Sequence, residues 1–179
     1  MKSREGYTTG QMQFEKTLDE MFITRGYTKS DKTWDFPYFH SHAKTSTGEI
    51  VVFIDPNPKL SVNTVKDCMS FMNSIGVTHC IIIYMESATP IVRKNVETVT
   101  TTRIELFSQR ELGYNVTKHS LVPVHCRASS TERAQMAQHS GKIAKLHKSD
   151  PVARFHGFRR GELVKITRKD KTVTFRVVI

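Results

Sequence analysis

The chain is poor in cysteine and has no long apolar run, and both absences limit what it can be. Its three cysteines, Cys68, Cys80 and Cys126, are odd in number and widely spaced. That pattern favours reduced thiols over the disulfide framework of a secreted protein. No run approaches the roughly 18 apolar residues of a membrane helix, and the first residues lack an apolar signal core. We therefore expect a protein that works inside the cell, without contact with a membrane.

Motifs for cofactor and metal chemistry are also missing. The sequence has no phosphate-binding loop, dinucleotide-binding turn or nucleophile elbow, so we expect no cofactor. Its eight histidines show no paired spacing that would supply four ligands to a metal ion. The strongest enzymatic alternative is a metal-dependent nuclease, which needs clustered carboxylates around Mg²⁺. Asp55 ends a predicted strand, but neither buried strand carries Glu-x-Lys, so we expect no catalytic or metal-binding residues.

The excess of positive charge lies in one part of the chain. The sequence holds 27 Lys and Arg against 17 Asp and Glu, which gives a formal net charge of +10. Residues 1–99 hold 11 of each sign, whereas residues 100–179 hold 16 basic and 6 acidic residues and carry the whole excess. Such a distribution favours nucleic acid or an acidic protein surface as the partner of the C-terminal part.

Apolar periodicity predicts a helix and a βαβ unit in the N-terminal part. The helix covers residues 11–25 and ends at Gly26. Apolar, β-branched runs at residues 50–54 and 80–84 are typical of strands buried on both faces of a parallel sheet. The helix that joins these strands starts at Ser61, ends at Gly76 and buries a stripe of apolar residues. We expect that stripe to be Val62, Val65, Met69, Met72 and Ile75.

Two further segments of the N-terminal part are predicted with less regular structure. The polar residues 27–48 are expected to form an irregular excursion that is held down by its aromatic side chains. A loop with Thr89 and Pro90 follows the second strand, and residues 104–107 could add a third strand to the sheet. We place a domain boundary near residues 108–120.

The C-terminal part reads as short helices and a hairpin. Ser129 and Glu132 have the spacing of a capping box at the start of a helix that Gly141 would end. Asp150 and Pro151 begin a brief helix that stops at Gly157. Strict alternation over residues 172–179 predicts a strand that pairs with residues 162–167 in a hairpin. Its stripe of Val173, Phe175 and Val177 is expected to be core, although edge pairing with a partner's sheet is an alternative.

Many residues of this C-terminal part follow the order of a known family. They are Leu121-Val122-Pro123, Asp150-Pro151-Val152-Ala153-Arg154, Gly157, and Arg160-Gly161-Glu162-Leu163-Val164-Lys165-Ile166. The sequence resembles the fifth-largest subunit of nuclear DNA-directed RNA polymerases, which polymerases I, II and III share and whose C-terminal part is similar to a small subunit of archaeal RNA polymerase. Weaker matches are Arg25-Gly26-Tyr27, Phe53 and Thr89-Pro90. The resemblance covers nearly the whole chain.

The resemblance implies two domains. Residues 1–110 would form an α/β jaw domain with a mainly parallel, nuclease-like sheet, which lies beside downstream DNA. Residues 111–179 would form a small α+β assembly domain, similar to the archaeal polypeptide, which docks on the largest polymerase subunit. The segment 141–149 is shorter than in the family and lacks its leucine-proline pair, so the chain is expected to be a divergent member.

The resemblance also implies which residues meet partners. The expected subunit interface consists of Asp150, Pro151, Val152, Arg154, Gly157, Arg160 and Gly161. Its arginines suit bidentate hydrogen bonds to a carboxylate or phosphate, and its glycines suit positive φ or a close backbone approach. The expected DNA-facing loop consists of Thr89, Pro90, Arg93 and Lys94, whose hydroxyl and basic groups suit phosphate oxygens. An ordinary solvated loop is the alternative there.

We therefore expect a non-catalytic subunit of a DNA-directed RNA polymerase that supports transcription in the nucleus, or in the nucleolus for a class I enzyme. Its partners would be the largest and other polymerase subunits and downstream double-stranded DNA, and it would not form a homo-oligomer. The alternative is a free-standing basic module that binds nucleic acid. Such a module should bind tightly when isolated, with a steep dependence on salt.

Overall fold

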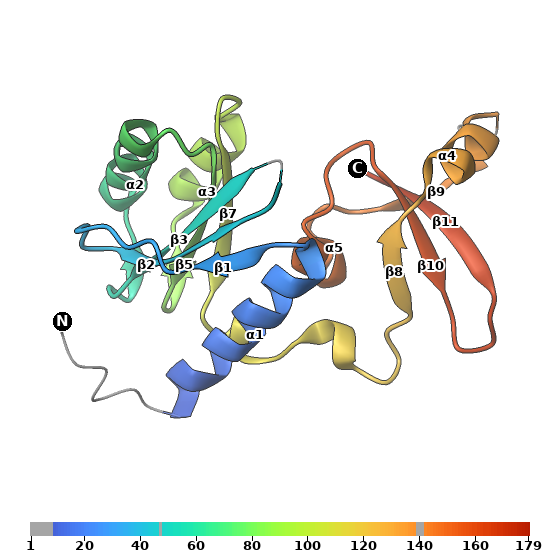
Figure 1. Ribbon diagram of the computed structural model, residues 1–179, viewed down its shortest axis with the longest axis horizontal. Helices are drawn as coiled ribbons and strands as arrows, with labels where there is room; N and C mark the ends of the chain where they lie inside the picture. Colours follow the sequence, from blue (N-terminus) through green and yellow to red (C-terminus); the bar gives the residue numbers. More distant parts are fainter. Residues whose placement is uncertain (1–8, 47, 139–141) are drawn as a thin grey trace. The chain divides into compact units, whose positions relative to one another are not determined.

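The computed structural model describes residues 9–46, 48–138 and 142–179 (Figure 1). The chain divides into two compact units, Met1–Tyr114 and Asn115–Ile179. The boundary expected after residue 110 lies four residues earlier than this division. The N-terminal unit holds 13 basic and 13 acidic residues, whereas the C-terminal unit holds 14 and 4, so the second unit carries the entire net charge of +10.

A five-stranded mixed sheet forms the centre of the N-terminal unit, in the order β1-β2-β3-β5-β7. Its parallel part consists of β3 (Glu49–Asp55), β5 (His79–Tyr84) and β7 (Arg103–Ser108), which confirms the βαβ unit and the third strand. The strands β1 (Thr28–Ser30) and β2 (Phe39–Lys44) extend it with antiparallel pairing. Two of four pairings are antiparallel, so the prediction of a mainly parallel sheet is wrong.

The same two strands correct the prediction that residues 27–48 are irregular. β1 and β2 have polar sequences, TKS and FHSHAK, without the apolar runs by which the inner strands were found. Backbone hydrogen bonds to an existing strand hold such segments in a sheet whatever their side chains. The expectation about the aromatic residues is confirmed: Trp34, Phe36, Tyr38 and Phe39 pack against the buried core of the sheet.

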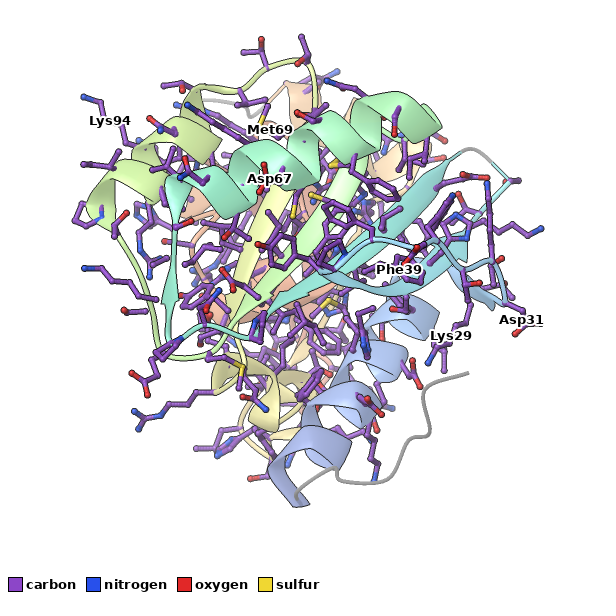
Figure 2. All side chains as sticks on the ribbon, turned by 90° about the vertical axis from the view of Figure 1, so that its left-hand side faces the viewer. Lys29, Asp31, Phe39, Asp67, Met69 and Lys94 are labelled. Atoms are coloured by element: carbon purple, nitrogen blue, oxygen red, sulfur yellow. The ribbon has the colours of Figure 1, made fainter. Side chains whose placement is uncertain are left out.

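Helices cover both faces of this sheet. Figure 2 shows α2 (Val62–Ile75) on one face and α1 (Thr9–Arg25) on the other. Along α1 the predicted apolar face is confirmed, because Phe14, Leu18, Met21 and Phe22 are buried. Gly26 follows with a φ of 79°, in the left-handed region that ends a helix.

The limits of α2 follow the prediction, but its buried stripe is shifted. Ser61 Oγ accepts a hydrogen bond from the Thr64 backbone N–H at 3.1 Å, and Gly76 ends the helix with a φ of 70°. The fully buried side chains are Thr64, Val65, Cys68 and Met72. Of the predicted stripe, Val62, Met69 and Ile75 are only half-buried, because the face that meets the sheet passes through the smaller Thr64 and Cys68.

The segment after β5 is more regular than predicted. β6 (Ser87–Ala88) pairs in parallel with β4 (Lys59–Leu60), and α3 (Pro90–Thr98) follows directly. Thr89 caps α3 and Pro90 is its first residue, so the predicted loop at these residues is wrong. Helix α3 buries only Val92, which leaves too little apolar periodicity to reveal it in the sequence.

The C-terminal unit is a four-stranded sheet with short helices. The sheet order is β8-β10-β11-β9, formed by β8 (Val124–Arg127), β10 (Leu163–Thr167), β11 (Val173–Val178) and β9 (Ala144–Leu146). The helices are α4 (Ser130–Ala137) and α5 (Pro151–His156), and two 3₁₀ turns, η1 (Glu111–Gly113) and η2 (Val116–Lys118), flank the boundary between the units. The hairpin of β10 and β11 and the capping box of Ser129 and Glu132 are confirmed.

Other sequence predictions for this part have mixed outcomes. Gly141, the expected end of α4, lies outside the described residues. Cys68 and Cys80 are buried, Cys126 is exposed, and all three are free thiols. None of the described helices is long and apolar enough to cross a membrane.

The predicted core stripe of β11 is on the wrong face. Val173 is 44% exposed, whereas Val178, from the opposite face, is 1% exposed. Val178 lies in the core of the C-terminal unit with Leu146, Ala153, Phe158, Val164 and Ile166. Alternation along a strand shows that the two faces differ, but both faces of β11 carry valines. Only the packing of α5 against one of them decides which is buried.

A buried ion network joins α1 to β5 and β7 in the N-terminal unit. Arg25 donates two hydrogen bonds to the Glu105 carboxylate, at 3.0 and 2.9 Å. His79 Nε2 lies 2.7 Å from Glu105 Oε1, and Arg103 Nη2 lies 3.0 Å from the same oxygen. The Tyr27 hydroxyl lies 3.2 Å from His79 Nδ1. These contacts suit a neutral His79 that donates from Nε2 and accepts at Nδ1.

The Glu105 carboxylate and the His79 imidazole both have shifted pKa values. Burial by itself would raise the pKa of Glu105, but Arg25, His79 and Arg103 outweigh it and hold that pKa far below its usual 4.5. Burial lowers the pKa of His79 below its usual 6.5, against the opposing effect of Glu105. Glu105 is therefore charged and His79 neutral in the folded unit at neutral pH.

The variant Glu105→Gln should lower the free energy of unfolding of the N-terminal unit by about 3 kcal/mol, because it leaves the Arg25 guanidinium buried without its counter-charge. Urea unfolding followed by the fluorescence of Trp34, which is the sole tryptophan, measures this unit alone. The exposed ion pair of Lys29 and Asp19 provides the control. Asp19→Asn should change stability by well under about 1 kcal/mol. Equal effects of the two variants would contradict the role of the network.

The stability of the N-terminal unit should also fall in acid. Both groups have lowered pKa values in the folded state, so the unfolded chain binds protons that the folded chain does not. The stabilisation should therefore be complete above pH 6.5, decline below it as His79 of the unfolded chain protonates, and decline further below 4.5 through Glu105. Urea unfolding followed by Trp34 fluorescence at a series of pH values measures this decline. The loss of stability below pH 4.5 should be smaller in Glu105→Gln.

Candidate functional site

The residues that carry the family resemblance surround α5 and the turn that follows it. Asp150 Oδ1 accepts hydrogen bonds from the backbone N–H groups of Val152 and Ala153, at 2.8 and 3.4 Å. Pro151 is the first residue of the helix, and Gly157 ends it with a φ of 64°. The predicted cap and stop are both confirmed. They hold a helix of six residues that would not persist by itself in water.

The side chains of α5 divide between core and surface. Val152 is 7% exposed and Ala153 fully buried, so these residues fix the helix within its own unit and offer little surface to a partner. Pro151 is exposed and Arg154 half-buried. Of the predicted interface residues on this helix, the structure thus leaves Pro151 and Arg154 accessible.

Beyond α5, four arginines gather around a hollow of about 410 Å³. We call it the arginine hollow; it is lined by Arg127, Arg133, Arg159, Arg160, Gly161, Glu162 and Leu163. Arg127 ends β8, Arg133 lies in α4, and the other residues form the turn into β10 and its first position. Pairing of β8 with β10 sets Arg127 opposite Val164, which brings these distant segments together.

Two of the four guanidinium groups are fixed by contacts inside the unit. Arg127 Nε lies 3.3 and 3.2 Å from the Glu162 carboxylate oxygens, and its Nη2 donates to the Gly157 carbonyl at 3.1 Å. The same guanidinium lies over the Phe158 ring, 5.2 Å from its centroid. Arg133 Nη1 donates to the Ala128 carbonyl at 3.1 Å. Both side chains are therefore held at the rim with donors to spare.

The other two guanidinium groups face solvent. Arg159 and Arg160 are exposed residues. Within the part of the chain that the structure describes, their side chains make no hydrogen bond or ion pair. The Arg159 backbone N–H donates to Glu162 Oε2 at 3.0 Å, which fixes the backbone of the turn but leaves the guanidinium available.

Comparison with known proteins agrees with this C-terminal pattern. Residues 114–178 match the family described as RNA polymerase Rpb5, C-terminal domain. The C-terminal unit therefore resembles the C-terminal domain of Rpb5. The match spans almost the whole C-terminal unit, and relatives extend the similarity through the N-terminal unit, so the resemblance seen in the sequence is confirmed.

The relatives of known function are moderately similar to the chain. It is 27% identical to the DNA-directed RNA polymerases I, II, and III subunit RPABC1 of Caenorhabditis briggsae, over 97% of this chain and 88% of the relative. The corresponding subunit of Caenorhabditis elegans is 26% identical over the same shares. That of Dictyostelium discoideum is 26% identical, over 94% of this chain and 96% of the relative. The similarity to these subunits thus extends over nearly the whole chain, at an identity below 30%.

Sequence reasoning found part of the arginine hollow. Arg160 and Gly161 were among the predicted interface residues and line it, whereas Asp150, Pro151 and Arg154 do not. The arginines missed are Arg127, Arg133 and Arg159. Arg159 could have been found beside Arg160. Arg127 is brought in by β8, a strand of four mostly exposed residues that gave no periodic signal, and Arg133 is brought in by α4, none of whose residues is buried.

The predicted DNA-facing residues are organised by α3. Thr89 Oγ1 accepts a hydrogen bond from the Val92 backbone N–H at 3.2 Å, so its hydroxyl caps the helix. Arg93 Nη2 donates to the Tyr84 hydroxyl at 3.0 Å, and its guanidinium lies 5.8 Å from the centre of that ring. Pro90 and Lys94 are exposed, and Figure 2 shows Lys94 at the surface. The structure thus brings the four residues together but uses Thr89 and Arg93 within the fold.

The carboxylate that a nuclease would use belongs to a turn. Asp55 ends β3 and is fully buried, and its Oδ1 accepts from the Asn57 backbone and side-chain amides at 3.0 and 2.7 Å. Within residues 9–46, 48–138 and 142–179, no group of three or more His, Cys, Asp or Glu side chains could hold a metal ion.

Gly161 gives a test of how the arginine hollow is built. Its φ is 86°, and a β-carbon there would meet no atom within 4 Å, so positive φ rather than close approach requires glycine. Gly161→Ala should lower the stability of the C-terminal unit by about 1 kcal/mol, and Gly161→Asn by less, because asparagine tolerates the left-handed region. Thermal unfolding by circular dichroism measures both. Equal losses would contradict the backbone explanation.

Proposed function

We propose that this protein is a non-catalytic subunit of a nuclear DNA-directed RNA polymerase, and that its C-terminal unit docks on the largest subunit. The observation that carries the proposal is the family match over residues 114–178, which spans the unit that holds the whole net charge of +10. Its relatives are named as subunits of polymerases I, II and III. A nuclear location follows from that role, with the nucleolus included for a class I enzyme.

The C-terminal unit has features that suit a docking module. Its core is closed by Val164, Val178 and their neighbours, so it offers a preformed surface that loses little conformational entropy on binding. The caps of α5 and the left-handed backbone at Gly157 and Gly161 hold α5 and the following turn in place, and so determine which of their residues are exposed on that surface. We include Asp150 and Val152 in the docking site as residues that shape it, and Pro151, Arg154 and Arg160 as residues that touch the partner.

For the N-terminal unit we propose a jaw-like position beside downstream DNA. Its equal numbers of basic and acidic residues predict weak independent attraction to phosphate, so the assembled enzyme would have to position it. The N-terminus of α3 at Thr89 and Pro90, with the exposed Lys94, is the part that we expect to face the DNA backbone. Arg93 would support this surface through Tyr84 rather than reach for phosphate itself.

Affinity purification of the tagged chain from its native cells tests the proposal. We expect the two largest polymerase subunits to be recovered in stoichiometric amounts, together with templated RNA synthesis in the eluate. The polymerase that is recovered would also identify the class or classes that use the chain. Recovery without any polymerase subunit would contradict the proposal.

A free-standing nucleic-acid-binding module is the second candidate, and the charge of the C-terminal unit favours it. The purified chain and duplex DNA, measured by fluorescence anisotropy at several salt concentrations, separate the two candidates. Under the proposal, binding at physiological salt should be no tighter than ordinary non-specific binding, with a Kd of about 1 μM or weaker. Tight binding with a steep salt slope, and no polymerase in the purification, would favour the module.

A further inference from the structure

The arginine hollow carries more positive charge than the fold itself uses. Its lining holds four arginines and one glutamate, with no lysine and no second acidic residue. Glu162 offsets one guanidinium through its contact with Arg127. Three positive charges remain around a volume of about 410 Å³. Exposed like charges repel one another at such short range, so this grouping stabilises the unit less than scattered arginines would.

The hollow already contains one carboxylate that accepts hydrogen bonds from its donors. The Glu162 carboxylate receives the Arg127 Nε–H and the backbone N–H of Arg159. The guanidinium of Arg127 is kept in place by the Gly157 carbonyl and the Phe158 ring, so it does not have to be ordered when a ligand arrives. Arg133 is similarly held by the Ala128 carbonyl. A second carboxylate beside Glu162 would find a fixed donor in Arg133 and available donors in Arg159 and Arg160.

From these contacts we infer that the arginine hollow binds an acidic segment of a partner protein, with one or two Asp or Glu side chains inserted among the arginines. The inference rests on the proposed function, because it names the chemistry by which the docking partner is recognised. Guanidinium groups bind carboxylates through two parallel hydrogen bonds, which lysine cannot do. Such pairs contribute most where water is excluded, and the buried Leu163 and Phe158 adjoin the donors.

A protein carboxylate fits the hollow better than a DNA duplex does. Duplex DNA presents a convex backbone with one charge about every 1.7 Å of its axis, and it suits an extended basic stripe. The arginine hollow is instead a recess drawn from three short segments, β8, α4 and the turn before β10. A side chain can enter a recess, whereas a duplex can only lie across its rim.

Charge reversal at the two exposed arginines tests the inference in the complex. The double variant R159E/R160E should reduce recovery of the largest polymerase subunit with the tagged chain by at least about tenfold, because two attractive contacts become repulsive. The matched control is R168E/K169E, which makes the same change of charge in the exposed turn between β10 and β11, at the other end of the hairpin. Equal recovery with both variants would overturn the inference.

The purified chain allows a test that does not depend on the polymerase. A capped peptide of six glutamates should bind the wild-type chain and the R168E/K169E control at low salt, and R159E/R160E should bind it at least about tenfold more weakly. Circular dichroism should show all three chains equally folded, because the altered side chains are exposed. Loss of duplex DNA binding in R159E/R160E with unchanged peptide binding would overturn the inference in favour of phosphate.

The two experiments separate the failure of the inference from that of the proposed function. If the wild-type chain recovers no polymerase subunit, the proposed function fails, and the peptide measurement still decides whether the hollow prefers carboxylates. If the wild-type chain recovers the polymerase and R159E/R160E recovers it equally well, the proposed function stands and the arginine hollow is not the docking site.

Discussion

The turn from α5 into β10 is the constraint on which the C-terminal unit depends. Gly157 and Gly161 both adopt left-handed backbone, with φ values of 64° and 86°, and they reverse the chain over four residues. The Gly161 N–H donates to the Val178 carbonyl at 2.9 Å, which ties the turn to β11. With the turn fixed in this way, Arg159 and Arg160 lie at the surface, and the Glu162 carboxylate contacts Arg127.

Charge is handled differently in the two units. In the N-terminal unit Glu105 takes contacts from two arginines and His79, and basic and acidic residues balance in number. In the C-terminal unit 14 basic residues face 4 acidic ones, of which Asp150 caps a helix and Glu132 pairs with Lys165. The first arrangement serves folding, because it satisfies charges that burial would otherwise penalise. The second leaves an excess of positive charge within the unit.

Those parts of the fold that local chemistry dictates could be read directly from the chain. Ser61, Ser129 and Asp150 cap helices where their side chains and spacing indicated, and apolar runs marked the parallel strands β3 and β5. Elements held by pairing or by one buried side chain were missed, namely β1, β2, β8 and α3. The strands β1, β2 and β8 have no apolar run and are held by pairing within a sheet, whereas the helix α3 buries only Val92.

What the sequence determined by itself is the resemblance to Rpb5, the distribution of charge between the units and the residues that begin and end most helices. These depend only on the identity and order of residues that are neighbours in the sequence. Only the tertiary structure decided which face of β11 is buried and which arginines share a hollow. The first depends on the packing of α5 against β11. The second depends on the pairing of β8 with β10, which lets Arg127 contact Glu162, 35 residues away, and no local pattern encodes which of several compatible arrangements packs best.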